Sequence, residues 1–261
     1  MTISKQPLRL NYNSDAAHTA FKKVMTGLPP SVELYLIGGS LRNALYREFH
    51  NEKLIQRDYD QVVTKGSKEY IEYLRSLGYN ERPYPSNQDK QVVYNMALSS
   101  KAEAGDSYDH WLVLDLHTVD GSTIEENIKY NAGFTINGCA IKASDLFSKP
   151  WKEAIVEVLP TAVQDIKEKR LRINPDGYKH MPSNFYAMLR FMSVGFSAPT
   201  NNEVRLLLTE LSNIEHSRFE RNVKKVWDYA GSEAKARQLV RSLGIDIDVF
   251  DEKALKIAFS H

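Results

Sequence analysis

The sequence of 261 residues has little cysteine and no long apolar run. Cys139 is its one cysteine, which excludes both an intrachain disulfide and a cysteine-rich zinc site. Such a chain suits a reducing compartment, and we expect a cytoplasmic protein. No run of about 18 apolar residues occurs and the first residues lack an apolar signal core, so we expect no membrane segment.

An excess of charge of one sign is also lacking. Lys and Arg total 34 and Asp and Glu total 33, which leaves a net charge of +1. This balance excludes a histone-like polycation, so contact with nucleic acid would need a local basic patch. The hydrophobic content of 42% is enough for a sizeable core, in one large domain or two modest ones.

The spacing of apolar residues predicts an α+β chain in two parts. Residues 1–144 are expected to form a mixed sheet with helices, and residues 145–261 an all-helical domain, because the strand signal fades after residue 144. Ser40 is the expected N-cap of the helix predicted at 40–49, which follows the strand predicted at 32–37. Residues 1–14 are expected to be loosely ordered. The predicted strands cover 32–37, 58–64, 91–98 and 111–117, and the predicted helices 16–28, 40–49, 67–77, 122–130, 161–172, 183–194, 202–211, 217–229 and 232–243.

Two aspartates, Asp58 and Asp60, follow a glycine pair by about twenty residues. On a strand they project from one face, because side chains alternate with a period of two. Carboxylates this close repel each other unless a cation lies between them, and Mg²⁺ prefers carboxylate and phosphate oxygens. Gly38 and Gly39, between a strand and a helix, expose backbone N–H groups to an anion such as a phosphate. A solvated strand end and an ordinary turn are the structural alternatives.

Asp115 lies in the apolar segment at 111–117. It is the best candidate for a third carboxylate that joins Asp58 and Asp60. Burial of a lone carboxylate there would be costly without a cation or a donor, and we expect Asp115 to act as metal ligand and general base. His117, two residues later, is interpreted as a packed core histidine rather than a ligand.

These segments together resemble the class II polynucleotide nucleotidyltransferases, which include tRNA CCA-adding enzymes and bacterial poly(A) polymerases. The family's Gly-Gly-x-Val-Arg-Asp and Asp-x-Asp signatures match Gly-Gly-Ser-Leu-Arg-Asn at residues 38–43 and Asp-Tyr-Asp at 58–60. Its Arg-Arg-Asp-Phe-Thr-Ile-Asn signature matches Asn-Ala-Gly-Phe-Thr-Ile-Asn at 131–137. Further similar segments lie at 162–172, 190–196, 217–221 and 239–245, so the resemblance spans roughly residues 32–245.

The resemblance implies a nucleotidyltransferase-fold head followed by a helical neck that binds nucleotide and RNA. It further implies an NTP substrate, two Mg²⁺ ions and an RNA 3′-hydroxyl acceptor, with release of pyrophosphate. The residues that it assigns to metal binding and catalysis are Asp58, Asp60 and Asp115. Those that it assigns to nucleotide binding are Gly38, Gly39, Ser40, Arg42, Asn137, Arg172, Asn184 and Arg190.

The sequence departs from the family pattern in two motifs. Residues 131–133 replace the Arg-Arg-Asp, and His180, Met181 and Asn184 stand where the family has its base-selecting Glu-Asp-x-x-Arg. Three functions therefore stay open: transfer to an RNA 3′ end, transfer to a protein or a small molecule, and binding of nucleotide or RNA without turnover.

Overall fold

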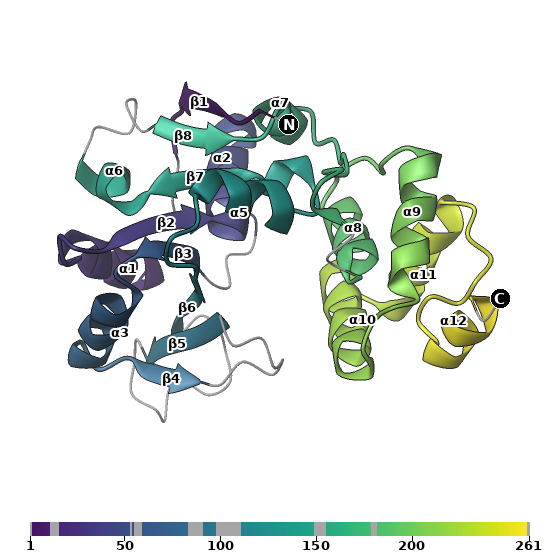
Figure 1. The fold of residues 1–261 in the computed structure, drawn as a ribbon. Helices are drawn as coiled ribbons and strands as arrows, with labels where there is room; N and C mark the ends of the chain where they lie inside the picture. The colour runs from purple at the N-terminus through teal and green to yellow at the C-terminus, as the bar shows by residue number, and fades with distance from the viewer. Residues whose placement is uncertain are drawn as a thin grey trace. The chain divides into compact units, whose positions relative to one another are not determined.

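The computed structural model describes most of the chain (Figure 1). The described residues are 2–10, 16–52, 54, 59–82, 91–97, 111–148, 155–178 and 182–259. They form two compact units, here called the head unit (Met1–Ile128 and Asn137–Val163) and the helical unit (Lys129–Ile136 and Gln164–His261). Among the described residues, no helix combines the length and the apolar character needed to cross a membrane.

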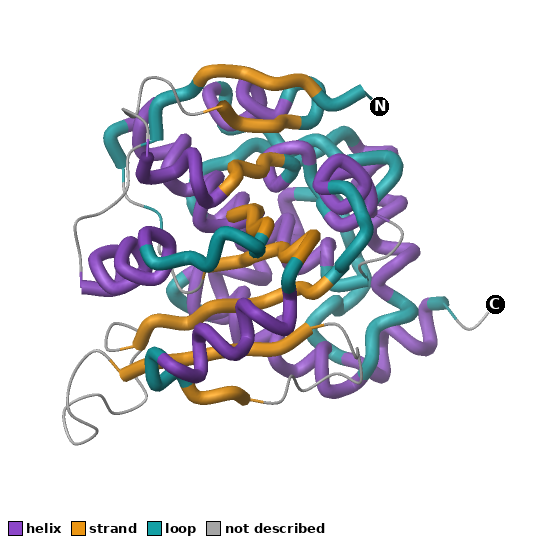
Figure 2. The backbone as a smooth tube through the Cα atoms, turned by 60° about the vertical axis from the view of Figure 1, so that its left-hand side comes forward, coloured by secondary structure: helices purple, strands orange, loops and turns teal. Residues whose placement is uncertain are grey.

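A mixed sheet runs through the head unit, and Figure 2 traces its strands in orange. The strand order is β1-β8-β7-β2-β3-β6-β5-β4. Neighbouring strands are antiparallel except β3 and β6, which are parallel. The strands are β1 (Ser4–Pro7), β2 (Glu33–Ile37), β3 (Tyr59–Lys65), β4 (Asn80–Arg82), β5 (Gln91–Ala97), β6 (Trp111–Thr118), β7 (Cys139–Lys142) and β8 (Ile155–Val158).

The helices α1 and α3 cover one face of this sheet. Tyr59 at the start of β3 stacks on Phe21 of α1, with ring centroids 4.1 Å apart. Gln61, two residues along the strand, accepts a 2.8 Å hydrogen bond from the buried hydroxyl of Tyr70 on α3. Asp60 therefore points to the opposite face of the sheet, because side chains alternate. The head helices are α1 (Ala16–Thr26), α2 (Gly38–His50), α3 (Ser67–Ser76), α5 (Ile124–Asn131, whose last residues belong to the helical unit) and α6 (Ala143–Ser148).

The helical unit is built around α8. Tyr186 on this helix is fully buried and packs edge to face against Phe219, and its hydroxyl donates to the Val249 carbonyl at 2.6 Å. A capping box between Thr200 and Glu203 starts α9. The helices are α7 (Ala162–Lys167, which begins in the head unit), α8 (Asn184–Ser193), α9 (Asn201–Leu211), α10 (His216–Ala230), α11 (Glu233–Ser242) and α12 (Glu252–Ala258).

The α+β class predicted from the sequence is confirmed, but several element predictions are wrong. Residues 4–7 form β1 and residues 155–158 form β8, two short strands that pair with each other and lack a long apolar pattern. Residues 161–172 do not form one helix: α7 ends at Lys167. Lys169 adopts a left-handed conformation with φ of 50°, and the Arg170 N–H bonds back to the Asp165 carbonyl, which is how a helix is terminated.

The boundary between the two units also differs from the expected division at residues 144 and 145. β8 lies beyond residue 144 yet completes the sheet of the head unit. In the other direction, residues 129–136 belong to the helical unit although they precede β7 in the chain. Long-range strand pairing of this kind leaves no signature in the local composition of the sequence.

Candidate active site

A sharp turn joins β2 to α2 in the head unit. Gly38 has φ of +62°, a conformation that residues with a side chain rarely adopt. A Cβ added at Gly38 would lie 2.8 Å from Oδ2 of Asp60, so the turn also needs glycine for space. The sequence prediction of Ser40 as N-cap is wrong, because α2 begins at Gly38 and Ile37 is its N-cap.

Asp60 lies against this turn. The backbone N–H of Gly39 donates to Oδ2 of Asp60 at 3.1 Å. This bond fixes one carboxylate oxygen of β3 at the first turn of α2, where the positive end of the helix dipole also favours an anion. The glycine pair and the second aspartate of the Asp-x-Asp segment therefore meet in the fold.

Asp115 is the neighbour of Asp60 across the sheet. The two residues are register partners on the parallel strands β3 and β6. Partners on parallel strands point to the same face, and their backbones are about 4.8 Å apart. Both side chains are partly exposed. The structure thus brings together two carboxylates that are 55 positions apart in the sequence.

Asp58, the third predicted carboxylate, lies outside the described residues. Within the described part of the chain, no group of three or more His, Cys, Asp and Glu side chains is placed to hold a metal ion. The donors that are described, two carboxylates on one face of the sheet, match the oxygen preference of Mg²⁺. His117 lies two residues beyond Asp115, and burial lowers its pKa, which fits the packed histidine favoured by the sequence.

Arg42 projects from the first turns of α2 and is held by two amides. Its Nε and one terminal nitrogen donate to Oδ1 of Asn43 at 3.1 and 2.9 Å, and its other terminal nitrogen donates to Oδ1 of Asn137 at 2.5 Å. These two amide oxygens orient the guanidinium, whose fork of N–H donors matches the geometry of phosphate oxygens. The orienting role of Asn43 was missed from the sequence, although its place directly after Arg42 at the start of a helix was visible there.

Ser40 bonds to the backbone of its own turn. Its side chain is fully buried, and its hydroxyl donates to the Ile37 carbonyl at 3.4 Å. Nearby, burial raises the pKa of the Cys139 thiol to about 12, and the positive charge of Arg42 opposes that shift.

In the helical unit, the partly exposed Arg172 pairs with a buried carboxylate. Oδ1 of Asp165, whose side chain is fully buried, lies 3.5 Å from a terminal nitrogen of Arg172. Oδ2 of Asp165 accepts a 2.7 Å hydrogen bond from the Thr135 hydroxyl. Asp165 therefore joins Arg172 to Thr135, a partner that the sequence did not reveal because nothing local marks a threonine as the partner of a distant carboxylate.

Asn184, also in the helical unit, is buried against Gly133. Its amide nitrogen donates to the Tyr178 carbonyl at 3.3 Å. A Cβ added at Gly133 would overlap the Asn184 amide group. The two departures from the family pattern at residues 133 and 184 are thus packed against each other, and Asn184 occupies the space that a side chain at position 133 would take.

Arg190, the last of the residues assigned to nucleotide binding, lies on the final turns of α8. Its guanidinium carbon is 5.9 Å from the centroid of the Tyr229 ring on α10. Gly38, Gly39, Ser40, Arg42 and Asn137 belong to the head unit, and Arg172, Asn184 and Arg190 belong to the helical unit.

Comparison with solved structures identifies the architecture. A CCA-adding enzyme solved with CTP matches 87% of this chain and 51% of its own, with a TM-score of 0.61 and 18% sequence identity. The Thermotoga maritima CCA-adding enzyme solved with tRNA matches 85% of this chain and 53% of its own, with a TM-score of 0.59 and 18% identity. The chain has the fold of the CCA-adding enzymes.

The fold likeness extends to a tRNA nucleotidyltransferase solved with a primer tRNA and an incoming ATP analogue, which matches 92% of this chain and 65% of its own at a TM-score of 0.57 and 19% identity. This chain spans about half the length of the CCA-adding enzymes that it matches. No protein-family model matches the sequence, and no curated protein does either. The prediction of a nucleotidyltransferase-fold head, followed along the chain by a helical part, is confirmed at the level of the fold.

Proposed function

We propose that this chain is a metal-dependent nucleotidyltransferase that transfers NMP from an NTP to an RNA 3′-hydroxyl, as a tRNA CCA-adding enzyme or a poly(A) polymerase does. The observation that carries the proposal is the register pairing of Asp60 and Asp115 beside the Gly38 turn. Solved neighbours of this fold contain CTP, ATP or tRNA, which supports an NTP and an RNA as the partners here. The reducing compartment indicated by the lone cysteine makes the cytoplasm the proposed location.

The proposed metal site consists of Asp58, Asp60 and Asp115, which would hold two Mg²⁺ ions. Bound Mg²⁺ lowers the pKa of an attacking hydroxyl and neutralises charge on the phosphates of an in-line displacement. The carboxylate oxygens of the two described aspartates suit this ion by their chemistry and by their place on one face of the sheet.

The residues of the turn would bind and orient the triphosphate. The N–H of Gly39 holds the Asp60 carboxylate in place, and the open glycine backbone lets a phosphate approach the start of α2. Arg42, oriented by Asn43 and Asn137, would form paired hydrogen bonds to phosphate oxygens. A carboxylate oxygen of Asp115 would take up the proton of the attacking 3′-hydroxyl as the new bond to the α-phosphorus forms and pyrophosphate leaves.

The helical unit would contribute nucleotide and RNA contacts. Arg172, Asn184 and Arg190 are the proposed nucleotide contacts of this unit. The head unit would carry catalysis, and the helical unit would carry recognition.

A second candidate is transfer of NMP to a protein or small-molecule acceptor. Asn184 stands at one of the positions where the family has its base-selecting residues, and its amide occupies the space beside Gly133, which replaces the aspartate of the family's Arg-Arg-Asp. This packing favours a changed choice of base or acceptor.

An assay with labelled substrate tests these functions. The protein is incubated with Mg²⁺ and each of the four α-³²P-labelled NTPs, and tRNA, total RNA or protein is added in turn. Label on RNA that disappears with EDTA supports transfer to RNA, and label on protein supports the second candidate. Nucleotide binding without release of pyrophosphate would overturn both and leave a binding protein.

A further inference from the structure

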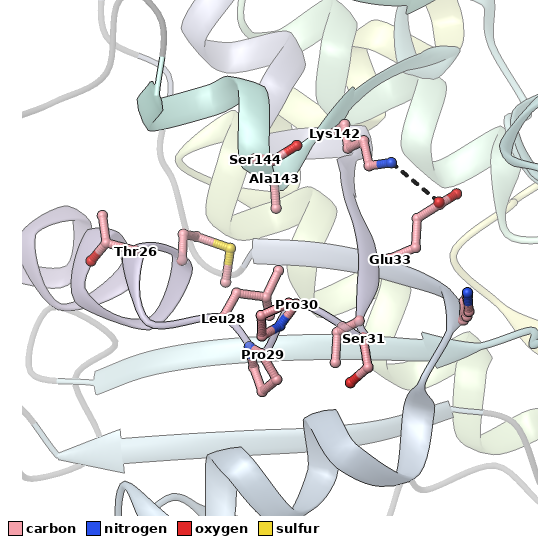
Figure 3. Close-up of a pocket in the computed structure, with 12 residues that line it drawn as sticks. Thr26, Leu28, Pro29, Pro30, Ser31, Glu33, Lys142, Ala143 and Ser144 are labelled. Atoms are coloured by element: carbon pink, nitrogen blue, oxygen red, sulfur yellow. Dashed lines mark hydrogen bonds and ion pairs between the residues drawn. The ribbon is translucent and has the colours of Figure 1, made fainter.

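A cavity of about 490 Å³ lies in the head unit, at the end of β2 that begins with Glu33 and thus away from Gly38. Figure 3 shows it in close-up. Pockets that hold small molecules measure roughly 300–1,000 Å³. The loop between α1 and β2 forms one wall, and the end of β7 with the start of α6 forms the other. The lining residues are Met25, Thr26, Leu28, Pro29, Pro30, Ser31, Val32, Glu33, Lys65, Lys142, Ala143 and Ser144.

One wall of the cavity holds a fixed ion pair. Nζ of Lys142 lies 3.1 Å from Oε2 of Glu33, as Figure 3 shows. The other oxygen of Glu33 accepts hydrogen bonds from Tyr35 at 3.0 Å and Thr64 at 3.1 Å. Burial tends to raise the pKa of Glu33, but the bonds from Lys142, Tyr35 and Thr64 lower it below its usual value. Glu33 is therefore held by three protein donors, and the Lys142 ammonium is anchored beside the cavity.

A second lysine, Lys65, also lines the cavity. Lys65 is the register partner of Glu33 on β3, and it is exposed. It makes no hydrogen bond or ion pair with any other side chain that the structure describes. Two ammonium groups against one carboxylate give this wall of the cavity a net positive charge.

The opposite wall is aliphatic. Leu28, Pro29 and Pro30 form the loop that faces the ion pair, and Met25 and Val32 extend the same surface. None of the described lining residues is aromatic, so this cavity offers no stacking surface for a nucleobase.

We propose that this cavity binds a small amphipathic anion, in which a carboxylate or phosphate group is attached to an aliphatic body. The anionic group lies between Lys65 and Lys142, and the body packs on Leu28 and Met25. An aliphatic wall alone would bind such a body weakly and without orientation, whereas a few placed charges fix it.

The cavity is separate from the candidate active site yet joined to it by two strands. β2 has Glu33 at one end and runs into Gly38 at the other, and β3 has Lys65 at one end and Asp60 near the other. The five residues of β2 rise by about 3.3 Å each, which places the two sites roughly 17 Å apart. Binding at this cavity therefore does not depend on the proposed transfer reaction.

Titration calorimetry on the full chain, without nucleotide or Mg²⁺, tests the proposal with five probes. Octanoate and octyl phosphate carry both parts of the ligand, 1-octanol carries the body alone, and acetate and inorganic phosphate carry the anionic group alone. We expect measurable binding of octanoate, of octyl phosphate or of both, and at least about tenfold weaker binding of the other three. The lower of the two dissociation constants identifies the preferred anionic group.

Variants locate the site. Lys65→Gln should weaken binding by about fivefold, the effect of one partly exposed charge pair, while Lys68→Gln on the exposed start of α3 should leave it unchanged. Ser31→Trp, at an exposed position on the cavity rim, should abolish binding without lowering the unfolding midpoint. Absence of binding by both amphipathic probes, or equal binding by the parent, Lys65→Gln and Ser31→Trp proteins, would overturn the proposal.

Discussion

Asp60 and Asp115 are register partners on the parallel strands β3 and β6, and the N–H of Gly39 holds the Asp60 carboxylate at 3.1 Å. Two carboxylates side by side on one face of a sheet are electrostatically unfavourable without a cation. Their pairing is the physical basis of the proposed transfer reaction.

Replacing either aspartate by asparagine removes a charge at this pair and keeps the shape of the side chain. Asp60→Asn and Asp115→Asn should each lower the rate of NMP transfer by more than about a hundredfold, the order observed when a preorganised electrostatic group is lost. Both variants should keep the parental circular dichroism spectrum, because asparagine has the shape of aspartate and still offers an acceptor oxygen. The rate is measured with labelled NTP under saturating Mg²⁺.

Asp120→Asn is the matched control for this charge change. Asp120 is exposed and accepts a 2.5 Å hydrogen bond from Ser67, outside the candidate site. Its rate should equal that of the parent. An Asp115→Asn protein that transfers NMP at the parental rate would refute the role of Asp115.

Gly38→Ala separates backbone strain from the positioning of Asp60. The left-handed φ of +62° should cost about 1–2 kcal/mol in the free energy of unfolding, and the new methyl group should displace the Asp60 carboxylate. Gly78→Ala carries a comparable strain, with φ of +83°, but its Cβ meets nothing within 4 Å. Urea denaturation should therefore give similar losses of stability for both variants, whereas only Gly38→Ala should lose transfer activity. Equal activity in the two would show that the turn does not position Asp60.

The packing of Gly133 against Asn184 predicts energetic coupling in the helical unit. Gly133→Ala should lower the free energy of unfolding by about 1–3 kcal/mol, because its methyl group overlaps the Asn184 amide. In an Asn184→Ala background the same substitution should cost less, with a coupling energy of roughly 0.5–3 kcal/mol. Denaturant titration of the four proteins of this cycle measures the coupling.

Gly244→Ala serves as the control for that cycle, because its Cβ meets nothing within 4 Å. Its cost should be the same with and without Asn184→Ala, to within about 0.5 kcal/mol. If Gly133→Ala behaves as additively as Gly244→Ala does, the two positions do not compete for one space.

The contact of His216 with Glu252 predicts pH-dependent attachment of α12 to α10. Nδ1 of His216 lies 2.5 Å from Oε2 of Glu252, and hydrogen bonding and charge attraction to Glu252 raise the pKa of His216. A raised pKa stabilises the fold below the unfolded pKa of histidine, about 6.5, and the contribution is lost as the pH rises through the folded value. The unfolding midpoint of His216→Gln should thus fall below that of the parent at about pH 6 and approach it at about pH 8. A larger difference at the higher pH would contradict the ion pair.

Local patterns predicted the class of most elements and the ends of many. β2, β3, α3, α9 and α11 lie within one or two residues of their predicted ranges, because hydrophobic periodicity and turn residues act over short distances. The strands β1 and β8 escaped prediction, since strands of four residues are stabilised by their partners and not by their own composition.

The sequence by itself determined the α+β class, the glycine turn and the aspartates that resemble a nucleotidyltransferase site. Only the tertiary structure decided that Asp115 is the neighbour of Asp60, that Asn43 and Asn137 hold Arg42, and that Asn184 fills the space beside Gly133. These relationships join residues on different elements, and strand register and side-chain packing fix them only when the whole chain folds. The cavity lined by Glu33, Lys65 and Lys142 has the same origin, because the ends of three strands create it together.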